Sequence, residues 1–233
     1  MLSCVIVCGG LATRLRPVTE TIPKSLIPIA GEPFISHQLR LIRSHDIRRV
    51  ILCAGYLGES IREFLGDGSI FDMRISYSFD GDRLLGTAGA IRRALPLLDS
   101  SFLVLYGDSY LPCEYANIVD AFNLSGKRGL MTIFRNEGSF DSSNVEAANG
   151  LILQYDKRNR TPAMRYIDYG LGVFERSVFE EFPPNEFRDL SQVYQHLLAE
   201  GDLASYEVAE RFYEIGSLSG IDDLEKYIAS PQP

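Results

Sequence analysis

Apolar positions along the chain follow two patterns that alternate with each other. The first is a short, nearly continuous run rich in β-branched residues, found at residues 2–8, 49–54 and 102–106. Runs of this length and composition predict strands that are buried on both faces. Residues 73–79 alternate between apolar and polar positions and predict a further strand.

The second pattern has helical spacing. Ile35, Leu39 and Ile42 recur at intervals of four and three residues, and residues 59–65 and 87–95 are also expected to be helical. Strands that alternate with helices in this way predict an α/β fold, with a mainly parallel sheet doubly wound in the Rossmann-like manner. Ligands bind such sheets beyond the carboxyl ends of the strands.

The second half of the chain is less regular but shows no boundary. We expect strands at residues 129–135, 151–155 and 166–174, and a last helix at residues 218–228. Asn149-Gly150 predicts a hairpin turn, and Asp189 or Ser191 is expected to cap another helix. No repeat, low-complexity tract or linker is visible, so we predict a single domain over residues 1–229.

Composition and charge exclude several classes of protein. The net charge of −8 argues against a nucleic-acid partner, because nucleic-acid binders carry a basic face. No run of about 20 apolar residues predicts a membrane span, and residues 1–10 lack the features of a signal peptide. We therefore expect a cytoplasmic protein. The four cysteines form no CxxC pair, which predicts buried free thiols rather than a zinc site or a disulfide framework.

The first thirty residues are locally basic within this acidic chain. Gly9-Gly10 follows a predicted buried strand, and glycines there let backbone N–H groups approach phosphate oxygens. Arg14 could grip a phosphate through two hydrogen bonds, and Lys24 would supply a point charge. The segment is neither a Walker loop nor a GxGxxG fingerprint. Phosphate binding and a solvated loop with incidental charges both remain open at this point.

A second candidate site follows the strand predicted at residues 102–106. Gly107-Asp108 stands at its carboxyl end, as Gly9-Gly10 stands at the end of the first strand. The two segments are therefore expected to meet in one crevice. A carboxylate at that point can hold Mg²⁺, which prefers oxygen ligands and phosphate partners. The alternative is an ordinary turn aspartate.

Residues 8–33 resemble the signature of the sugar-1-phosphate nucleotidyltransferase family, GGxGTRLxPxTxxxPKxxxPxxxxP. The matching positions are Gly9, Gly10, Thr13, Arg14, Leu15, Pro17, Thr19, Pro23, Lys24, Pro28 and Pro33. Ala12 departs from the family's third glycine. The resemblance implies the nucleotide-diphospho-sugar transferase fold, with a nucleotide-binding half at about residues 1–125 and a sugar-binding half at about residues 126–229. It also implies that Cys8, Gly9, Gly10, Thr13 and Arg14 bind the nucleotide, and that Arg14 and Lys24 are catalytic.

A second stretch, LGTAGA at residues 85–90, is similar to the family's base-contacting turn. The resemblance implies that Gly86 and Thr87 line the nucleobase. The alternative is a helix start with Thr87 as its N-cap. The family's usual acidic residue three positions before Gly86 is Arg83 here, and Asp80 and Asp82 lie nearby. Asp82 could accept hydrogen bonds from guanine.

Further similarities concern the metal and the sugar. The family's Gly-Asp motif implies that Asp108 binds Mg²⁺ and faces the sugar phosphate. A later motif would place Glu214 as the second metal ligand, where the family has the shorter Asp. Lys157 falls where a lysine usually holds the sugar phosphate. Asp168, Gly170 and Asn144 are candidates for the sugar side, although a surface lysine and a strand-edge acid need no functional explanation.

The resemblance extends over nearly the whole chain and is closest to bacterial heptose or mannose 1-phosphate guanylyltransferases and muramic acid 1-phosphate uridylyltransferases. It implies transfer of a nucleotidyl group, best from GTP, to a heptose or mannose 1-phosphate, with Mg²⁺ as cofactor, in sugar nucleotide biosynthesis for cell-envelope polysaccharide. A UTP-dependent uridylyltransferase, an alcohol-phosphate nucleotidyltransferase and a non-catalytic sensor of sugar nucleotides remain alternatives. The missing GxGxxG disfavours a dinucleotide oxidoreductase. Homo-oligomer formation remains open.

Overall fold

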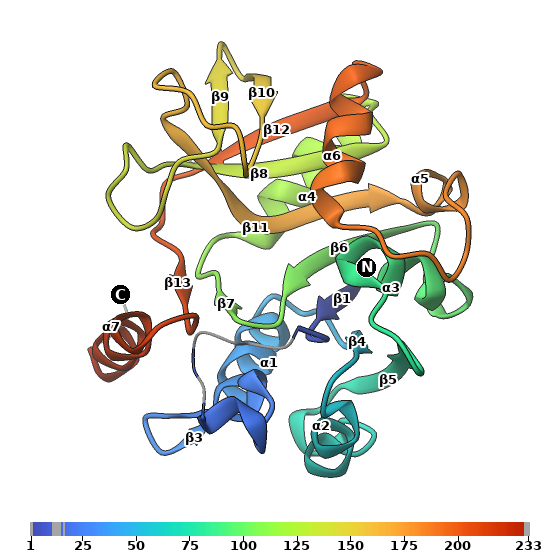
Figure 1. The fold of residues 1–233 in the computed structure, drawn as a ribbon, viewed down its shortest axis with the longest axis vertical. Helices are drawn as coiled ribbons and strands as arrows, with labels where there is room; N and C mark the ends of the chain where they lie inside the picture. Colours follow the sequence, from blue (N-terminus) through green and yellow to red (C-terminus); the bar gives the residue numbers. More distant parts are fainter. Residues whose placement is uncertain (1, 11–14, 16, 231–233) are drawn as a thin grey trace.

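A nine-stranded sheet forms the centre of the protein (Figure 1). The computed structural model describes residues 2–10, 15 and 17–230. Four parallel strands make up one side of the sheet, in the order β6-β1-β4-β5. These are β1 (Ser3–Val7), β4 (Arg49–Ala54), β5 (Arg74–Phe79) and β6 (Ser101–Tyr106). The predicted strands of the first half are thus confirmed, and their parallel order places their carboxyl ends along one edge.

The other side of the sheet is mixed. Strand β11 (Tyr166–Glu175) runs antiparallel to β6 and continues the sheet to β8 (Gly129–Arg135) and to a hairpin. The hairpin consists of β9 (Val145–Ala148) and β10 (Leu151–Tyr155), and its turn residues Asn149 and Gly150 both have positive φ, as the predicted Asn-Gly turn requires. Strand β12 (Leu203–Val208), which the apolar pattern did not predict, lies parallel to β8.

Helices cover both faces of the sheet, so the doubly wound α/β architecture is confirmed. The alternation along β1 shows why: Cys4 and Ile6 pack into one core, and Val5 and Val7 into the other. The first core includes side chains of α1 (Phe34–Ser44), α2 (Gly58–Leu65) and α4 (Tyr115–Ser125). The second includes α3 (Gly86–Ala94), α5 (Arg176–Glu180) and α6 (Leu190–Ala199). Helix α4 is not among the helices that the sequence pattern predicts.

Only short elements form in the segment after β1, because Pro17, Pro23 and Pro28 exclude a long helix there. They are η2 (Val18–Glu20), η3 (Lys24–Leu26), β2 (Pro28–Ile29) and β3 (Glu32–Pro33). Two further 3₁₀ turns, η4 (Ser69–Phe71) and η5 (Leu95–Leu97), precede β5 and β6. Of these elements, η3 carries Lys24, whose side chain reaches the edge of the sheet at Asp108.

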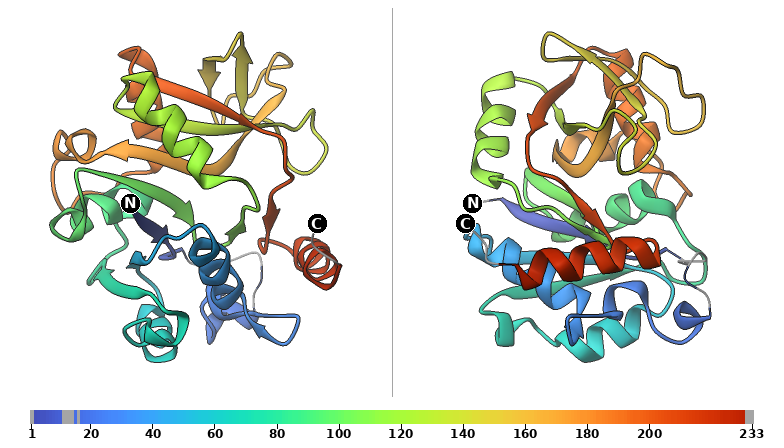
Figure 2. Two further views of the ribbon diagram at one scale, coloured as in Figure 1. Left: turned by 180° about the vertical axis from the view of Figure 1, so that it is seen from behind. Right: turned by 90° about the vertical axis from the view of Figure 1, so that its left-hand side faces the viewer.

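The end of the chain returns to the N-terminal half. Strand β13 (Tyr213–Glu214) pairs with β7 (Ser109–Tyr110), and α7 (Leu218–Ala229) packs near β2 (Figures 1 and 2). Leu224 of α7 shares a small third core with Ile29 and Phe34. This return carries residues 213–216 to the carboxyl-end edge of the sheet. Among the described residues, none of the helices has the length and apolar character needed to cross a membrane.

Candidate functional site

The ends of β1 and β6 form the floor of a crevice. Val7 and Tyr106 are register partners, and the Gly107 N–H donates to the Val7 carbonyl at 2.8 Å. A Cβ at Gly107 would lie 2.6 Å from the Cβ of Cys8, so glycine allows this close approach. The cavity above has a volume of about 240 Å³ and is lined by Val7, Cys8, Gly10, Lys24, Ser25, Thr87, Tyr106, Gly107 and Asp108. The two strand-end segments therefore do meet in one crevice.

An ion pair crosses this crevice. Lys24, the first residue of η3, places its ammonium nitrogen 2.6 Å from Oδ2 of Asp108. Both side chains are partly exposed to the crevice, at 20% for Lys24 and 34% for Asp108. Gly216 lies beside this pair: a Cβ built there would be in ordinary contact with the Lys24 ammonium, at 3.6 Å. The structure thus joins two predicted site residues from distant parts of the chain.

Glu214 reaches the same place through backbone pairing. It lies opposite Ser109 in the β13–β7 ladder, and the next N–H, of Ile215, donates to the Asp108 carbonyl at 3.0 Å. Glu214 has an exposed side, yet protein atoms crowd its carboxyl group. This desolvation, with the negative charges of Asp108 and Asp141, raises the pKa of Glu214 to about 7. Water at its exposed side screens part of the repulsion.

The donor set suits a divalent cation. Asp108 offers carboxylate oxygens, the ligands that Mg²⁺ prefers, in a crevice large enough for phosphates. Glu214 lines an adjoining cavity and lies opposite Ser109, the residue after Asp108. Burial, and then the negative charges of Asp108 and Asp141, raise the pKa of Glu214, so the acids at this point repel one another. The Lys24 ammonium is a cation that pairs with Asp108. A cation at this point would relieve the repulsion between the acids.

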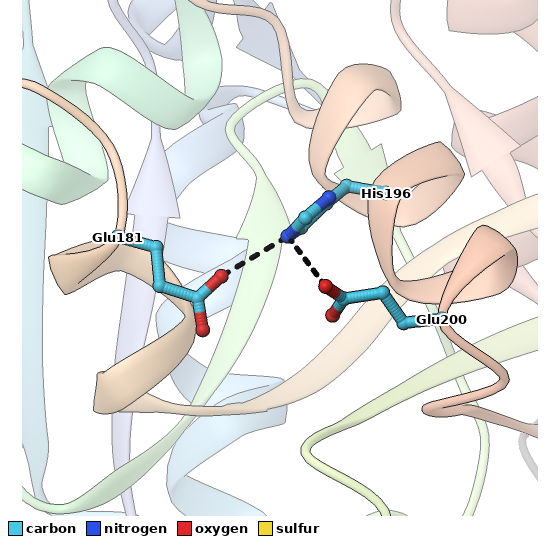
Figure 3. A group of neighbouring side chains, drawn as sticks. All are labelled: Glu181, His196 and Glu200. Carbon is cyan, nitrogen blue, oxygen red and sulfur yellow. Dashed lines mark hydrogen bonds and ion pairs between the residues drawn. The ribbon is translucent and has the colours of Figure 1, made fainter.

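A different cluster has metal-ligand spacing but a different environment. Glu181, His196 and Glu200 form the one group of three such side chains found among the described residues (Figure 3). The His196 ring lies 3.0 Å from Glu181 and 3.5 Å from Glu200. Arg128 pairs with both glutamates and with Asp202. The guanidinium holds all three carboxylates in ion pairs, and the group lies outside the crevice, so we assign it a structural role.

The predicted phosphate loop is only partly described. Thr13 and Arg14 lie outside the described residues. Gly9 packs against Gly55, where an added Cβ would come within 3.0 Å of the Gly55 nitrogen, whereas Gly10 faces open space. Cys8 is partly buried, and burial raises the pKa of its thiol to about 12. Cys8 is therefore a neutral thiol, and the described part of the loop offers its backbone to a ligand.

The LGTAGA stretch binds a segment of the protein itself. Helix α3 begins at Gly86 with Leu85 as its N-cap, so the expectation that Thr87 could be the cap was wrong. The Thr87 hydroxyl instead accepts a hydrogen bond from the Leu190 N–H at 2.6 Å. The N–H groups of the next two residues donate to the Arg188 carbonyl. The small residues thus admit residues 186–190 onto the start of α3, while Thr87 still lines the crevice.

Two aspartates near this turn lie in different environments. Asp82, the predicted base contact, is exposed. Asp80 is buried, accepts a hydrogen bond from the Leu85 N–H at 3.1 Å and has a pKa raised chiefly by burial. Asp80 therefore stabilises the turn before α3 through its hydrogen bond with Leu85, a role that the sequence pattern did not indicate. Its position directly after β5, at the carboxyl end of a parallel strand, was the available signal.

The four sugar-side candidates are connected. The Lys157 ammonium lies 3.8 Å from Oδ2 of Asp168 and 3.4 Å from the Tyr106 hydroxyl. Asp168 is only 3% exposed, and its carboxylate accepts hydrogen bonds from the Tyr155 hydroxyl and the Gly170 N–H. Asn144 is buried and accepts a hydrogen bond from the Asp168 N–H. Asp168 and Asn144 thus support Lys157, which lines a neighbouring cavity of about 480 Å³.

Comparison with protein families identifies the chain. A family model described as nucleotidyl transferase matches residues 3–230. The chain belongs to this family. Mannose-1-phosphate guanylyltransferase of Mycobacterium tuberculosis is 31% identical over 98% of this chain and 66% of its own length. UTP–glucose-1-phosphate uridylyltransferase of Synechocystis is 28% identical over 89% of this chain and 58% of its own length.

A shorter match carries higher identity. N-acetylmuramate α-1-phosphate uridylyltransferase of Neisseria meningitidis is 38% identical over 46% of the chain and 47% of its own length. The chain spans about half to two thirds of the length of the curated relatives that it matches. The family resemblance read from residues 8–33 is therefore confirmed.

Solved structures confirm the fold. HddC from Yersinia pseudotuberculosis, complexed with GMP-PN, has a TM-score of 0.81 at 20% identity and covers 98% of this chain and 100% of its own. A Bacillus anthracis protein in complex with sucrose reaches a TM-score of 0.88 at 19% identity, over 100% and 97% of the two chains. At these identities the likeness concerns the architecture, which is that of the nucleotide-diphospho-sugar transferase type.

Proposed function

We propose that this protein transfers a nucleotidyl group from a nucleoside triphosphate to a sugar 1-phosphate and releases pyrophosphate. The observation that carries the proposal is the Lys24–Asp108 ion pair, which lies in the crevice at the carboxyl ends of the parallel strands. The chain belongs to the nucleotidyl transferase family. A paired cation and carboxylate at that point suit a polyphosphate and its metal. Because nucleoside triphosphates are cytoplasmic substrates, we infer the same compartment for the protein.

The reaction needs no covalent enzyme intermediate. An oxygen of the sugar phosphate forms a bond to the α-phosphorus, and the bond from that phosphorus to the bridging oxygen breaks, leaving its electron pair on pyrophosphate. The attacking phosphate is already anionic, so no general base is required. What the protein supplies is position and charge. Lys24 would stabilise the triphosphate and the leaving pyrophosphate, and Arg14 is proposed for the same task.

Asp108 and Glu214 are proposed to hold Mg²⁺. The ion would neutralise phosphate charge and act as a Lewis acid and template. The β13–β7 pairing fixes the backbone at Glu214, so its longer side chain would approach the same ion from strand β13, whereas Asp108 would approach it from the turn between β6 and β7. The backbone of Gly9 and Gly10, with Thr13, Gly86 and Thr87, is proposed to surround the nucleotide.

Lys157 is proposed to receive the acceptor phosphate. Its side chain is 40% exposed, and the ammonium contacts the Asp168 carboxylate and the Tyr106 hydroxyl. Because Asp168 and Asn144 are nearly buried, we infer that they act on the substrate through Lys157 and the strand bulge at Gly170. The register of the β11–β8 ladder shifts between Asp168 and Gly172, and such a bulge interrupts regular pairing at Gly170.

The substrate pair can be determined by one experiment. Four nucleoside triphosphates are combined with heptose, mannose, glucose, glucosamine and muramic acid 1-phosphates, with Mg²⁺, and pyrophosphate release is measured. We expect GTP with a heptose or mannose 1-phosphate to give the highest kcat/KM. Preference for UTP would change the donor while retaining the reaction. Activity with alcohol phosphates alone, or tight binding of sugar nucleotides with no turnover, would favour the two remaining alternatives and contradict the proposal.

A further inference from the structure

Gln38 occupies a position in α1 that its chemistry does not favour. It lies on the apolar stripe of the helix with Ile35 and Leu39, and it is fully buried. Burying a primary amide costs free energy unless hydrogen bonds replace those to water. The reason for a glutamine here must therefore lie in its partners.

Those partners are two backbone carbonyls on either side of Asp108. The Gln38 Nε2 group donates to the Tyr106 carbonyl at 2.9 Å and to the Ser109 carbonyl at 2.7 Å. Both partners are acceptors, so only the amide nitrogen can face them, and this fixes the orientation of the side chain. The two bonds span the turn formed by Gly107 and Asp108 between β6 and β7.

The other end of the amide is unsatisfied. Within the part of the chain that the structure describes, Oε1 of Gln38 is buried and has no hydrogen-bond partner. Such an acceptor destabilises the fold. The two hydrogen bonds that Nε2 donates to the carbonyls of the turn offset this cost, and they tie helix α1 to the turn that carries Asp108.

Helix α1 also connects this turn with Lys24. The Phe34 N–H, at the start of the helix, donates to the Ile27 carbonyl at 2.9 Å, and the Ile27 N–H donates to the Lys24 carbonyl at 3.1 Å. Helix α1 therefore holds both segments. Its first residue, Phe34, binds the segment that carries Lys24, and Gln38, four residues later, binds the turn that carries Asp108. This arrangement fixes the relative positions of the two backbone segments from which the ammonium and the carboxylate extend.

We propose that Gln38 is a positioning residue for the Asp108 turn: it sets the carboxylate where the cation and Lys24 need it, without touching substrate. The inference rests on the proposed metal role of Asp108. Groups that orient a metal ligand from behind typically change metal affinity or activity by about 10- to 100-fold when removed. Gln38 would orient Asp108 in this way by binding the backbone carbonyls on either side of it, and not by binding its carboxylate.

The test replaces Gln38 by methionine, which has nearly the same length and volume but no N–H donor. Mn²⁺, a paramagnetic ion that accepts the same oxygen ligands, is titrated into the protein together with a non-hydrolysable triphosphate. We expect the Mn²⁺ Kd of Gln38→Met to rise about tenfold and kcat to fall by a similar factor. KM for the sugar phosphate should change less than twofold.

Two controls separate the possible causes. Ile42→Val removes a buried methyl group one turn further along α1 and should leave the Mn²⁺ Kd unchanged. Asp108→Asn tests the metal role itself, and if it binds Mn²⁺ as the wild type does, the proposed metal site is wrong. If Asp108→Asn loses Mn²⁺ while Gln38→Met keeps wild-type Kd and kcat, the metal site stands and the role of Gln38 is refuted.

A second variant, Gln38→Glu, keeps the proposal testable if Gln38→Met does not fold. Gln38→Glu has almost the same shape, and its carboxylate cannot donate to two carbonyls at neutral pH. We expect the same weakened Mn²⁺ binding from a folded Gln38→Glu protein, checked by its thermal transition. Wild-type Mn²⁺ affinity in this variant would equally overturn the proposal.

Discussion

The ammonium of Lys24 lies 2.6 Å from Oδ2 of Asp108, although 84 positions separate the two residues. In the absence of substrate, Lys24 therefore supplies the positive charge at a carboxylate that we propose to be a metal ligand. Lys24 and the metal ion would compete for Asp108 until a triphosphate gives the ammonium another anionic partner.

This competition predicts two opposite effects of Lys24→Met. Turnover should fall by about a hundredfold, since a charge aimed at the transition state in a preorganised site is lost. Mn²⁺ should bind the nucleotide-free variant more tightly than the wild type, because Asp108 is no longer paired. Steady-state kinetics and a Mn²⁺ titration measure the two effects. Lys127→Met, at a surface lysine that contacts the Gly201 carbonyl, is the control and should change neither.

Asp108→Asn keeps the size of the side chain and removes the anion. Activity should fall to near background, and raising Mg²⁺ should recover little of it, because a neutral amide is a poor ligand for this ion. A magnesium titration of the initial rate measures this. Asp72→Asn, which alters an exposed carboxylate paired with Arg43 and Arg48, should titrate as the wild type does. An unchanged magnesium response in Asp108→Asn would contradict the metal assignment.

Glu214 distinguishes a metal ligand from a strand residue. Glu214→Gln should abolish most turnover, whereas Glu214→Asp, which restores the residue usual in the family, should keep substantial activity. Both variants are compared over a magnesium series. If Glu214 only faces solvent, both changes should lie within about 0.5 kcal/mol of neutral in stability and leave the rate unchanged. Equal, near-wild-type rates would leave Asp108 as the only side-chain carboxylate assigned to the metal.

Lys157→Met should act on the acceptor and spare the donor. KM for the sugar 1-phosphate should rise about tenfold or more, since a charge-assisted hydrogen bond to phosphate is worth about 1.5–3 kcal/mol. KM for the nucleoside triphosphate should change less than twofold. Varying each substrate at saturating levels of the other separates the two constants. A rise confined to the triphosphate KM would place Lys157 on the wrong substrate.

Arg128→Met tests the structural role of the surface cluster. Hydrogen bonds from Arg128, and then from His196, hold the pKa of Glu181 below its ordinary value. The contribution of Glu181 to stability is therefore present above its unfolded-state pKa and is lost as pH falls through the lower folded-state pKa. Thermal unfolding should show Arg128→Met below the wild type at pH 7, with the gap narrowing below about pH 4. Turnover should not change.

Local pattern was sufficient for much of this fold. The β-branched run ending at Val7 predicted the central strand, and Asn149-Gly150 predicted the hairpin turn, because each depends on neighbours in the sequence. Helix α4 and strand β12 were missed. Gln38 was visible as a polar residue on the apolar stripe of α1, but its partners could not be inferred from that position.

The sequence by itself determined the family, the parallel strands and the meeting of Gly9-Gly10 with Gly107-Asp108, since parallel strands bring their carboxyl ends to one edge. The family resemblance paired Glu214 with Asp108 as metal ligands, but only the tertiary structure shows the β13–β7 pairing that brings their backbones together, because β13 has two residues and no periodic signal. The tertiary structure also decided that Thr87 binds the Leu190 N–H, and that Gln38 holds the Asp108 turn. Such contacts depend on how separate elements pack, which no local pattern of residues records.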